Sequence, residues 1–142
     1  MNIAKLRQSL ILHEGIELKP YKCTADKLTI GVGRNLDDVG ISHDEAMTLL
    51  DNDLDRCIED LGRNVPGWRL HSEVRQNVLI EMVFNLGINR FLKFAKMHEA
   101  LKRYDYNAAA NEMLNSKWAK QVGKRAVTMA NMMRSGEWHV PN

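Results

Sequence analysis

A glutamate at the end of a helix is the first residue in this chain whose position suggests chemistry. Apolar residues recur at three- and four-residue spacing at Ile3, Leu6 and Leu10. This spacing predicts an amphipathic helix that ends at Gly15 and carries Glu14 on its last turn. The free carbonyl groups and the dipole at that end disfavour an anion, and apolar neighbours would desolvate the carboxyl. Both effects favour the protonated form that a general acid needs, although a solvated glutamate beside a glycine cap is an equally simple interpretation.

Other common catalytic centres lack their sequence signatures. The five histidines never fall at the i, i+4 spacing of a helical zinc site, and neither cysteine has a second cysteine or a histidine at ligand distance. We therefore expect no metal ion and no cofactor. The pair Gly31 and Gly33 lacks the third glycine and the following helix of a dinucleotide fingerprint, so nucleotide binding is not expected.

The residues that follow Glu14 form a longer motif. Residues 14–34 read EGIELKPYKCTADKLTIGVGR. This segment resembles the catalytic stretch of the phage T4-type lysozymes, the endolysins of glycoside hydrolase family 24. In that family a Glu-Gly pair leads, at set spacing, to a Tyr, an acidic residue and a Thr within a Thr-Ile-Gly-x-Gly strand. Glu14, Tyr21 and Thr29 match the pattern. Residues 81–87 also look like the family's central buried helix, and residues 116–138 look like its C-terminal signature.

The resemblance implies a muramidase that hydrolyses the β-1,4 bond between N-acetylmuramic acid and N-acetylglucosamine in peptidoglycan. Glu14 would be the general acid, and Thr29 would help to place a water on the opposite face of the sugar, because the family is associated with inversion. Phe84 would border the saccharide cleft. Arg125 matches a family arginine that approaches the catalytic glutamate, and Tyr21 would support the site.

Cys23 is the main departure from the family pattern, because it occupies the position of the family's aspartate. A neutral thiol is a poor base, whereas a thiolate can act as a base or as a nucleophile. Three interpretations stay open. Cys23 acts as base or nucleophile, Asp26 supplies the carboxylate instead, or Glu14 and Thr29 suffice without either.

The elements that must position these residues are mainly helical. Thr29 to Gly33 read as a strand in a small hairpin or three-stranded sheet, and Ser42 with Glu45 is a capping box that begins a helix of about five turns. Ser72 caps an apolar central helix. We predict one lysozyme-like α+β domain, with two lobes joined by the long helix. The small lobe covers about residues 15–60, and the helical lobe covers about 61–142 together with the N-terminal helix.

Composition bounds the class of protein. The chain has 142 residues, 44% of them hydrophobic and 27% charged, and a formal net charge of +2, which is typical of one globular domain. No apolar run has the length of a membrane span, and two cysteines are too few for a secreted disulfide framework. The C-terminal half of the chain is basic. A solvated charged surface explains this charge better than a nucleic-acid partner does.

The resemblance and the missing leader together predict a monomeric endolysin without a membrane anchor. It would accumulate in the host cytoplasm and reach the periplasmic peptidoglycan with the help of a separate holin. A lytic transglycosylase and a catalytically dead peptidoglycan-binding relative are the alternative functions. The two tryptophans Trp118 and Trp138 are expected to be core or capping aromatics, and Cys57 a buried inert thiol.

Overall fold

A computed structural model describes residues 1–139 of the chain. They form two compact units, Met1–Leu49 and Leu50–Asn142. Helix α2 (His43–Asn64) begins in the first unit and continues into the second. The predicted fold class is confirmed, since the described residues form a mainly helical protein with one small antiparallel sheet.

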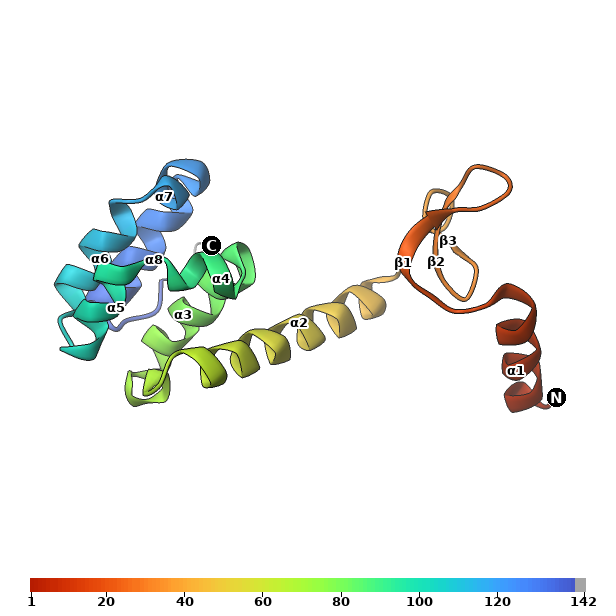
Figure 1. Cartoon of the computed structure of the whole chain (residues 1–142), viewed down its shortest axis with the longest axis horizontal. Helices are drawn as coiled ribbons and strands as arrows, with labels where there is room; N and C mark the ends of the chain where they lie inside the picture. Colours follow the sequence, from red (N-terminus) through yellow and green to blue (C-terminus); the bar gives the residue numbers. More distant parts are fainter. Residues whose placement is uncertain (140–142) are drawn as a thin grey trace. The chain divides into compact units, whose positions relative to one another are not determined.

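The first unit contains a helix and the sheet. Helix α1 (Ile3–Glu14) is followed by β1 (Glu17–Lys22), β2 (Leu28–Gly31) and β3 (Arg34–Asn35) (Figure 1). The strands pair in the order β1-β2-β3, and both pairs are antiparallel. Strand β1 is an edge strand and has an irregular register between Glu17 and Tyr21, where Pro20 is tolerated because an edge strand does not need every N–H.

The end of α1 and the start of α2 confirm the signals in the sequence. The Asn2 side chain caps the start of α1, and the Gly15 N–H closes its other end on the Ile11 carbonyl at 2.8 Å. At the start of α2, the Ser42 N–H donates to Glu45 Oε1 at 2.9 Å, and the Glu45 N–H donates to Ser42 Oγ at 3.1 Å. This reciprocal pair is the predicted capping box.

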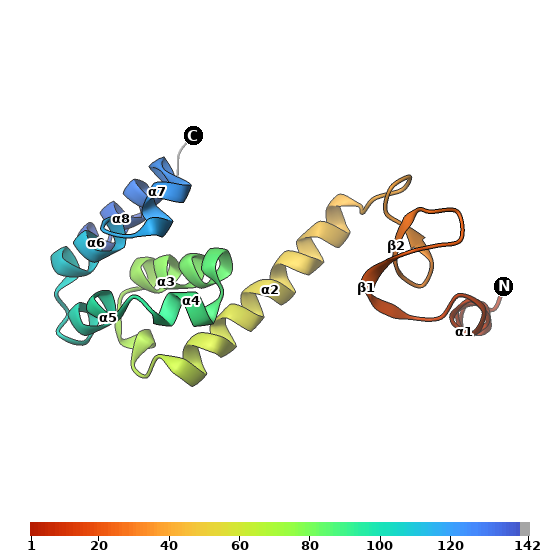
Figure 2. The same cartoon turned by 45° about the horizontal axis from the view of Figure 1, so that its top comes forward.

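The second unit is a bundle of short helices around α3. After the rest of α2 come a 3₁₀ turn (Trp68–Leu70), α3 (Glu73–Leu86), α4 (Ile88–Leu92), α5 (Ala95–Lys102), α6 (Tyr106–Leu114), α7 (Lys117–Val122) and α8 (Lys124–Ser135). Helices α6 and α8 run alongside each other in both views (Figures 1 and 2). Ser72 caps α3 and Gly87 closes it, as predicted.

The hydrophobic core lies in the second unit. Every buried hydrophobic residue within the described part of the chain falls between Cys57 and Met133, and Thr29 is the buried residue of the first unit. Trp118 is buried and donates its indole N–H to Asn85 Oδ1 at 2.8 Å, and Cys57 is buried as expected. Trp138 is not a core aromatic, because its side chain is 56% exposed. Trp138 follows the glycine that ends α8, beyond the last turn that packs into the core.

Of the helices in residues 1–139, none combines the length and apolar character needed to cross a bilayer.

Candidate functional site

Glu14 occupies the last turn of α1, as the sequence predicted. Glu14 is exposed within the first unit, and of the neighbours expected to desolvate it Leu10 is 46% and Leu18 is 85% exposed, while Ile11 is half-buried. The expected apolar surroundings are therefore absent from this unit. No group among residues 1–139 forms a hydrogen bond to the Glu14 side chain.

The Glu14 side chain lies against the turn between β2 and β3. A Cβ atom placed on Gly33 would be 2.9 Å from Glu14 Oε2, 3.2 Å from Cδ and 3.3 Å from Cγ. Gly33 has a φ of +65°, in the left-handed region that favours glycine. The helix end and the sheet therefore meet at this glycine, and the carboxyl rests on the turn that follows β2.

Cys23 lies at the other end of the same strand, in the turn between β1 and β2. The Cys23 N–H donates to the Lys27 carbonyl at 2.9 Å, and the Asp26 N–H donates to the Cys23 carbonyl at 2.9 Å. The loop between Cys23 and Lys27 has three residues, and its last, Asp26, has a φ of +60°. Three-residue hairpin loops commonly end on a left-handed residue, and aspartate tolerates that conformation. Turn geometry thus accounts for the residue type at position 26.

Backbone amides of this turn surround the Cys23 thiol. The N–H groups of Lys27 and then of Ala25 hold the pKa of the half-buried Cys23 thiol below its ordinary value, because hydrogen bonds to sulfur favour the thiolate. Desolvation acts in the opposite direction and is weaker than the backbone hydrogen bonds.

Thr29 is held in place between these two turns. It lies on β2 opposite Tyr21 of β1, it is only 3% exposed, and its hydroxyl donates to the Lys27 carbonyl at 2.8 Å. Because a hydroxyl has one proton, this bond leaves the oxygen lone pairs of Thr29 as acceptors. In this orientation the Thr29 oxygen can accept a hydrogen bond from a water.

Phe84 and Arg125 belong to the second unit, where both line one groove of about 680 Å³. The groove is mostly apolar, with Leu54, Ile80 and Trp138 in its wall. Phe84 is 44% exposed, although it lies on the central helix α3. Arg125 Nη2 lies 4.0 Å from Glu81 Oε1. The structure therefore gathers the predicted residues into two sets, with Glu14, Tyr21, Cys23 and Thr29 in the first unit.

Sequence reasoning missed the role of Lys27. Its backbone N–H faces the Cys23 sulfur, and its carbonyl accepts from both the Cys23 N–H and the Thr29 hydroxyl. A backbone role leaves no trace in residue type, so no signal in the sequence could reveal it. Among residues 1–139, no cluster of three or more His, Cys, Asp or Glu side chains could hold a metal ion.

A helical body, a small antiparallel sheet and a glutamate at a helix end beside a strand that carries threonine define a lysozyme-like α+β protein. The family model of phage lysozyme matches residues 12–135. The chain therefore belongs to the phage lysozyme family, as the motif predicted. Membership makes it a lysozyme-type glycosidase with peptidoglycan as its substrate.

Three relatives support this assignment. The chain is 33% identical over 135 residues to a SAR-endolysin of Escherichia phage Mu. This alignment covers 87% of this chain and 76% of the relative. It is 24% identical over 163 residues to a probable T4-type lysozyme of Dictyostelium discoideum, with 94% and 96% covered. It is 28% identical over 117 residues to an endolysin of Acyrthosiphon pisum secondary endosymbiont phage 1, with 80% and 77% covered.

Proposed function

We propose that this protein is an endolysin that hydrolyses the β-1,4 bond between N-acetylmuramic acid and N-acetylglucosamine, with Glu14 as general acid and Cys23 and Thr29 on the side of the water. The observation that carries the proposal is the arrangement along β2. Glu14 rests on the turn after the strand, Thr29 lies on it, and the Cys23 thiol is held by backbone amides at the turn before it.

The chemical step assigns each proton. Glu14 donates its proton to the glycosidic oxygen as the bond from that oxygen to C1 breaks. A water on the opposite face attacks C1, and the Cys23 thiolate takes the proton that the water loses. The Thr29 oxygen accepts the second hydrogen of that water, because its own proton is donated to Lys27. With both of its hydrogens held by Cys23 and Thr29, the water directs a lone pair at C1 of the sugar.

The thiolate as base is the interpretation that the turn geometry favours. Backbone N–H groups that lower the pKa of Cys23 raise the thiolate fraction near neutral pH. A thiolate can also attack C1 directly as a nucleophile. Asp26 as the source of the carboxylate has less support, because the left-handed turn position accounts for its presence.

The stereochemistry of the first product separates these mechanisms. With purified peptidoglycan glycan strands, proton NMR at early times should show the α-anomer at the new reducing end if Cys23 activates water, since that route inverts C1. The β-anomer would mean two displacements through a covalent intermediate on Cys23. A 1,6-anhydro end in place of a reducing end would mean a lytic transglycosylase and would overturn the hydrolytic assignment.

Variants connect the reaction to the named residues. Glu14→Gln should stop the clearing of permeabilised Gram-negative cells, and Glu17→Gln is the matched control, because Glu17 is an exposed carboxylate three residues further along the chain. Cys23→Ser should lose most activity, while Asp26→Asn should keep it. If the wild-type protein binds glycan strands and releases no product, it is a binding relative and the proposal is wrong.

The remaining roles rest on the family resemblance. We assign Phe84 to the border of the saccharide cleft, Arg125 to the surroundings of the catalytic glutamate and Tyr21 to the support of Thr29, which lies opposite it in the sheet. The monomeric state, the accumulation in the host cytoplasm and the need for a separate holin stay predictions. Co-expression in a host with and without a holin, followed by culture turbidity, tests the last of them.

A further inference from the structure

Few polar contacts hold Glu14, although the proposed general acid must direct a proton to one oxygen. Its backbone is fixed by the end of α1, where the Gly15 N–H binds the Ile11 carbonyl. Its side chain, however, forms no hydrogen bond within residues 1–139. Within the first unit, the Glu14 carboxyl lies beside Gly33, where an added Cβ would be 2.9 Å from Oε2.

A side chain at position 33 would meet the Glu14 carboxyl. A Cβ at 2.9 Å from Glu14 Oε2 would overlap the oxygen, so one group would have to move. The turn itself resists movement, and the carboxyl is the free end of a flexible side chain. An alanine at position 33 would consequently displace the Glu14 carboxyl rather than the backbone beneath it.

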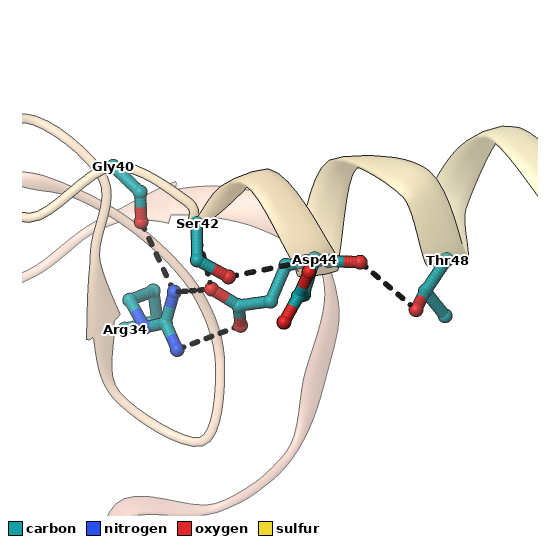
Figure 3. Close-up of polar contacts among 6 residues, drawn as sticks. Arg34, Gly40, Ser42, Asp44 and Thr48 are labelled. Atoms are coloured by element: carbon teal, nitrogen blue, oxygen red, sulfur yellow. Dashed lines mark hydrogen bonds and ion pairs between the residues drawn. The ribbon is translucent and has the colours of Figure 1, made fainter.

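The turn resists movement because its next residue is clamped. Arg34 donates from Nη1 to Glu45 Oε1 and from Nη2 to Glu45 Oε2, both at 2.8 Å, and from Nη1 to the Gly40 carbonyl at 3.1 Å. Figure 3 shows the Arg34 guanidinium between the Gly40 carbonyl and the first turn of α2. A bidentate pair of this kind fixes orientation as well as distance. These hydrogen bonds link the turn at Gly33, beside the Glu14 carboxyl, to the start of α2.

We propose that Gly33 is a positioning residue for the general acid, whose lack of a side chain sets where the Glu14 carboxyl lies when it protonates the glycosidic oxygen. This inference rests on the proposed role of Glu14. It gives a physical reason for the second glycine of the Thr-Ile-Gly-x-Gly strand beyond the left-handed φ of the turn.

Gly31 provides a matched control in the same turn. Its φ of +69° is close to the +65° of Gly33, so alanine meets similar backbone strain at both positions. A Cβ on Gly31 has no atom within 4 Å, whereas a Cβ on Gly33 meets the Glu14 carboxyl. The difference between Gly33→Ala and Gly31→Ala therefore isolates the contact with Glu14 from the strain of the turn.

The first measurement is the steady-state kinetics of both variants on soluble glycan strands. Gly33→Ala should lower kcat about 10- to 100-fold relative to Gly31→Ala with little change in KM, because misplacing a catalytic group by about 1 Å can cost that much in rate. Glu14→Asp shortens the acid by one methylene and should relieve the overlap, so its loss should be smaller in the Gly33→Ala background than in the wild type. Equal kcat values for the two alanine variants, or fully additive losses, would overturn the inference.

The second measurement does not depend on activity. The ¹³C chemical shift of the Glu14 carboxyl carbon, assigned with Glu14→Gln, should change in Gly33→Ala and stay at its wild-type value in Gly31→Ala. Equal shifts in all three proteins would show that position 33 does not place the carboxyl. If the shift changes as expected and Glu14→Gln remains active, the contact is real but Glu14 is not the acid, and the proposed function fails instead.

Discussion

A thiol and a carboxylate at the same position titrate in different ranges, and this gives residue 23 a distinct signature in the pH dependence of the enzyme. The ordinary pKa is about 8.5 for a cysteine and about 3.9 for an aspartate. The backbone amides of Lys27 and Ala25 hold the pKa of the Cys23 thiol below its ordinary value. The same backbone N–H groups would also favour the carboxylate of an aspartate at position 23, because hydrogen bonds to the charged form stabilise it.

The Cys23→Asp variant should therefore be active at more acidic pH than the wild type. In the wild type, activity should rise with pH as Cys23 loses its proton, because in the proposed mechanism the thiolate is the form that accepts the proton of the water. In Cys23→Asp this rise should move to lower pH, because the carboxylate is already ionised there. The measurement is the initial rate of turbidity loss from about pH 4 to pH 9 for both proteins.

Two controls make the result specific to residue 23. Cys57→Ser removes the other, buried thiol, so it should leave the position of the rising limb unchanged. Superimposable profiles for the wild type and Cys23→Asp would mean that Glu14 and Thr29 suffice, and that no group at position 23 takes part in the reaction.

At the scale of elements, capping signals in the sequence predicted the end of α1 at Gly15 and the starts of α2 and α3 at Ser42 and Ser72. Asn2, Ser42 and Ser72 begin helices, and Gly15 and Gly87 end them, because these residue types satisfy the unpaired backbone groups of a helix. Helices α4 and α5 are separated by a break at Lys93 and Phe94. No glycine or proline marks that break. Phe94 instead leaves the helical path where its ring meets Trp118 edge-on at 6.3 Å, a tertiary contact that local sequence does not encode.

The candidate site, like the helices, could be predicted from the sequence only in part. The sequence was enough to identify Glu14, Cys23 and Thr29 as site candidates, because the motif consists of residue types at fixed spacing. The hydrogen bonds of the Lys27 backbone and the contact at Gly33 depend on how the chain turns back on itself. Only the folded hairpin could reveal them.

The clamp between β3 and α2 leads to a prediction about stability and pH. Arg34 and the Ser42 N–H hold the pKa of the Glu45 carboxyl down at about 2, against an ordinary value of 4.5. Because the folded-state pKa is depressed, the ion pair stabilises the fold above about pH 4.5 and this contribution is lost as pH falls toward about 2. Glu45→Gln should accordingly be less stable than the wild type at pH 7, and the difference should shrink below pH 4.5.

Hydrogen exchange can follow this clamp locally. The amides of Leu36 and Ala46 report on it, since they bind the Leu28 and Ser42 carbonyls at 2.7 and 2.9 Å. Asp44→Asn is the matched control, because it removes a carboxylate from the same helical turn that contacts only His43, at 3.9 Å. An equal loss of protection in both variants would mean that the helix dipole, and not the pair with Arg34, is what matters.

At the scale of the whole molecule, the two units differ in how much apolar surface they bury on their own. The second unit holds the buried hydrophobic residues of the described chain. Arg75 ties its helices together by donating to the Met133 and Arg134 carbonyls at 2.7 and 3.0 Å, with the guanidinium 3.6 Å from the centre of the Tyr106 ring. In the first unit Ile3, Leu6 and Leu10 of α1 are all close to half exposed, and Leu12 is 81% exposed. Burial of apolar surface is the main favourable term in folding, so the two units should differ in autonomous stability.

A fragment of residues 42–142, which keeps the Ser42 cap and all of α2, should fold by itself, whereas residues 1–41 should not. Far-UV circular dichroism should show a helical fragment 42–142 that unfolds cooperatively on heating, and no cooperative transition for 1–41. Within the longer fragment, Leu79→Ala should cost about 2 to 5 kcal/mol, because Leu79 is fully buried. Leu70→Ala should cost much less, because Leu70 is 72% exposed. A cooperative transition in fragment 1–41, or equal effects of the two leucine substitutions, would show that the core of the second unit is not what stabilises the protein.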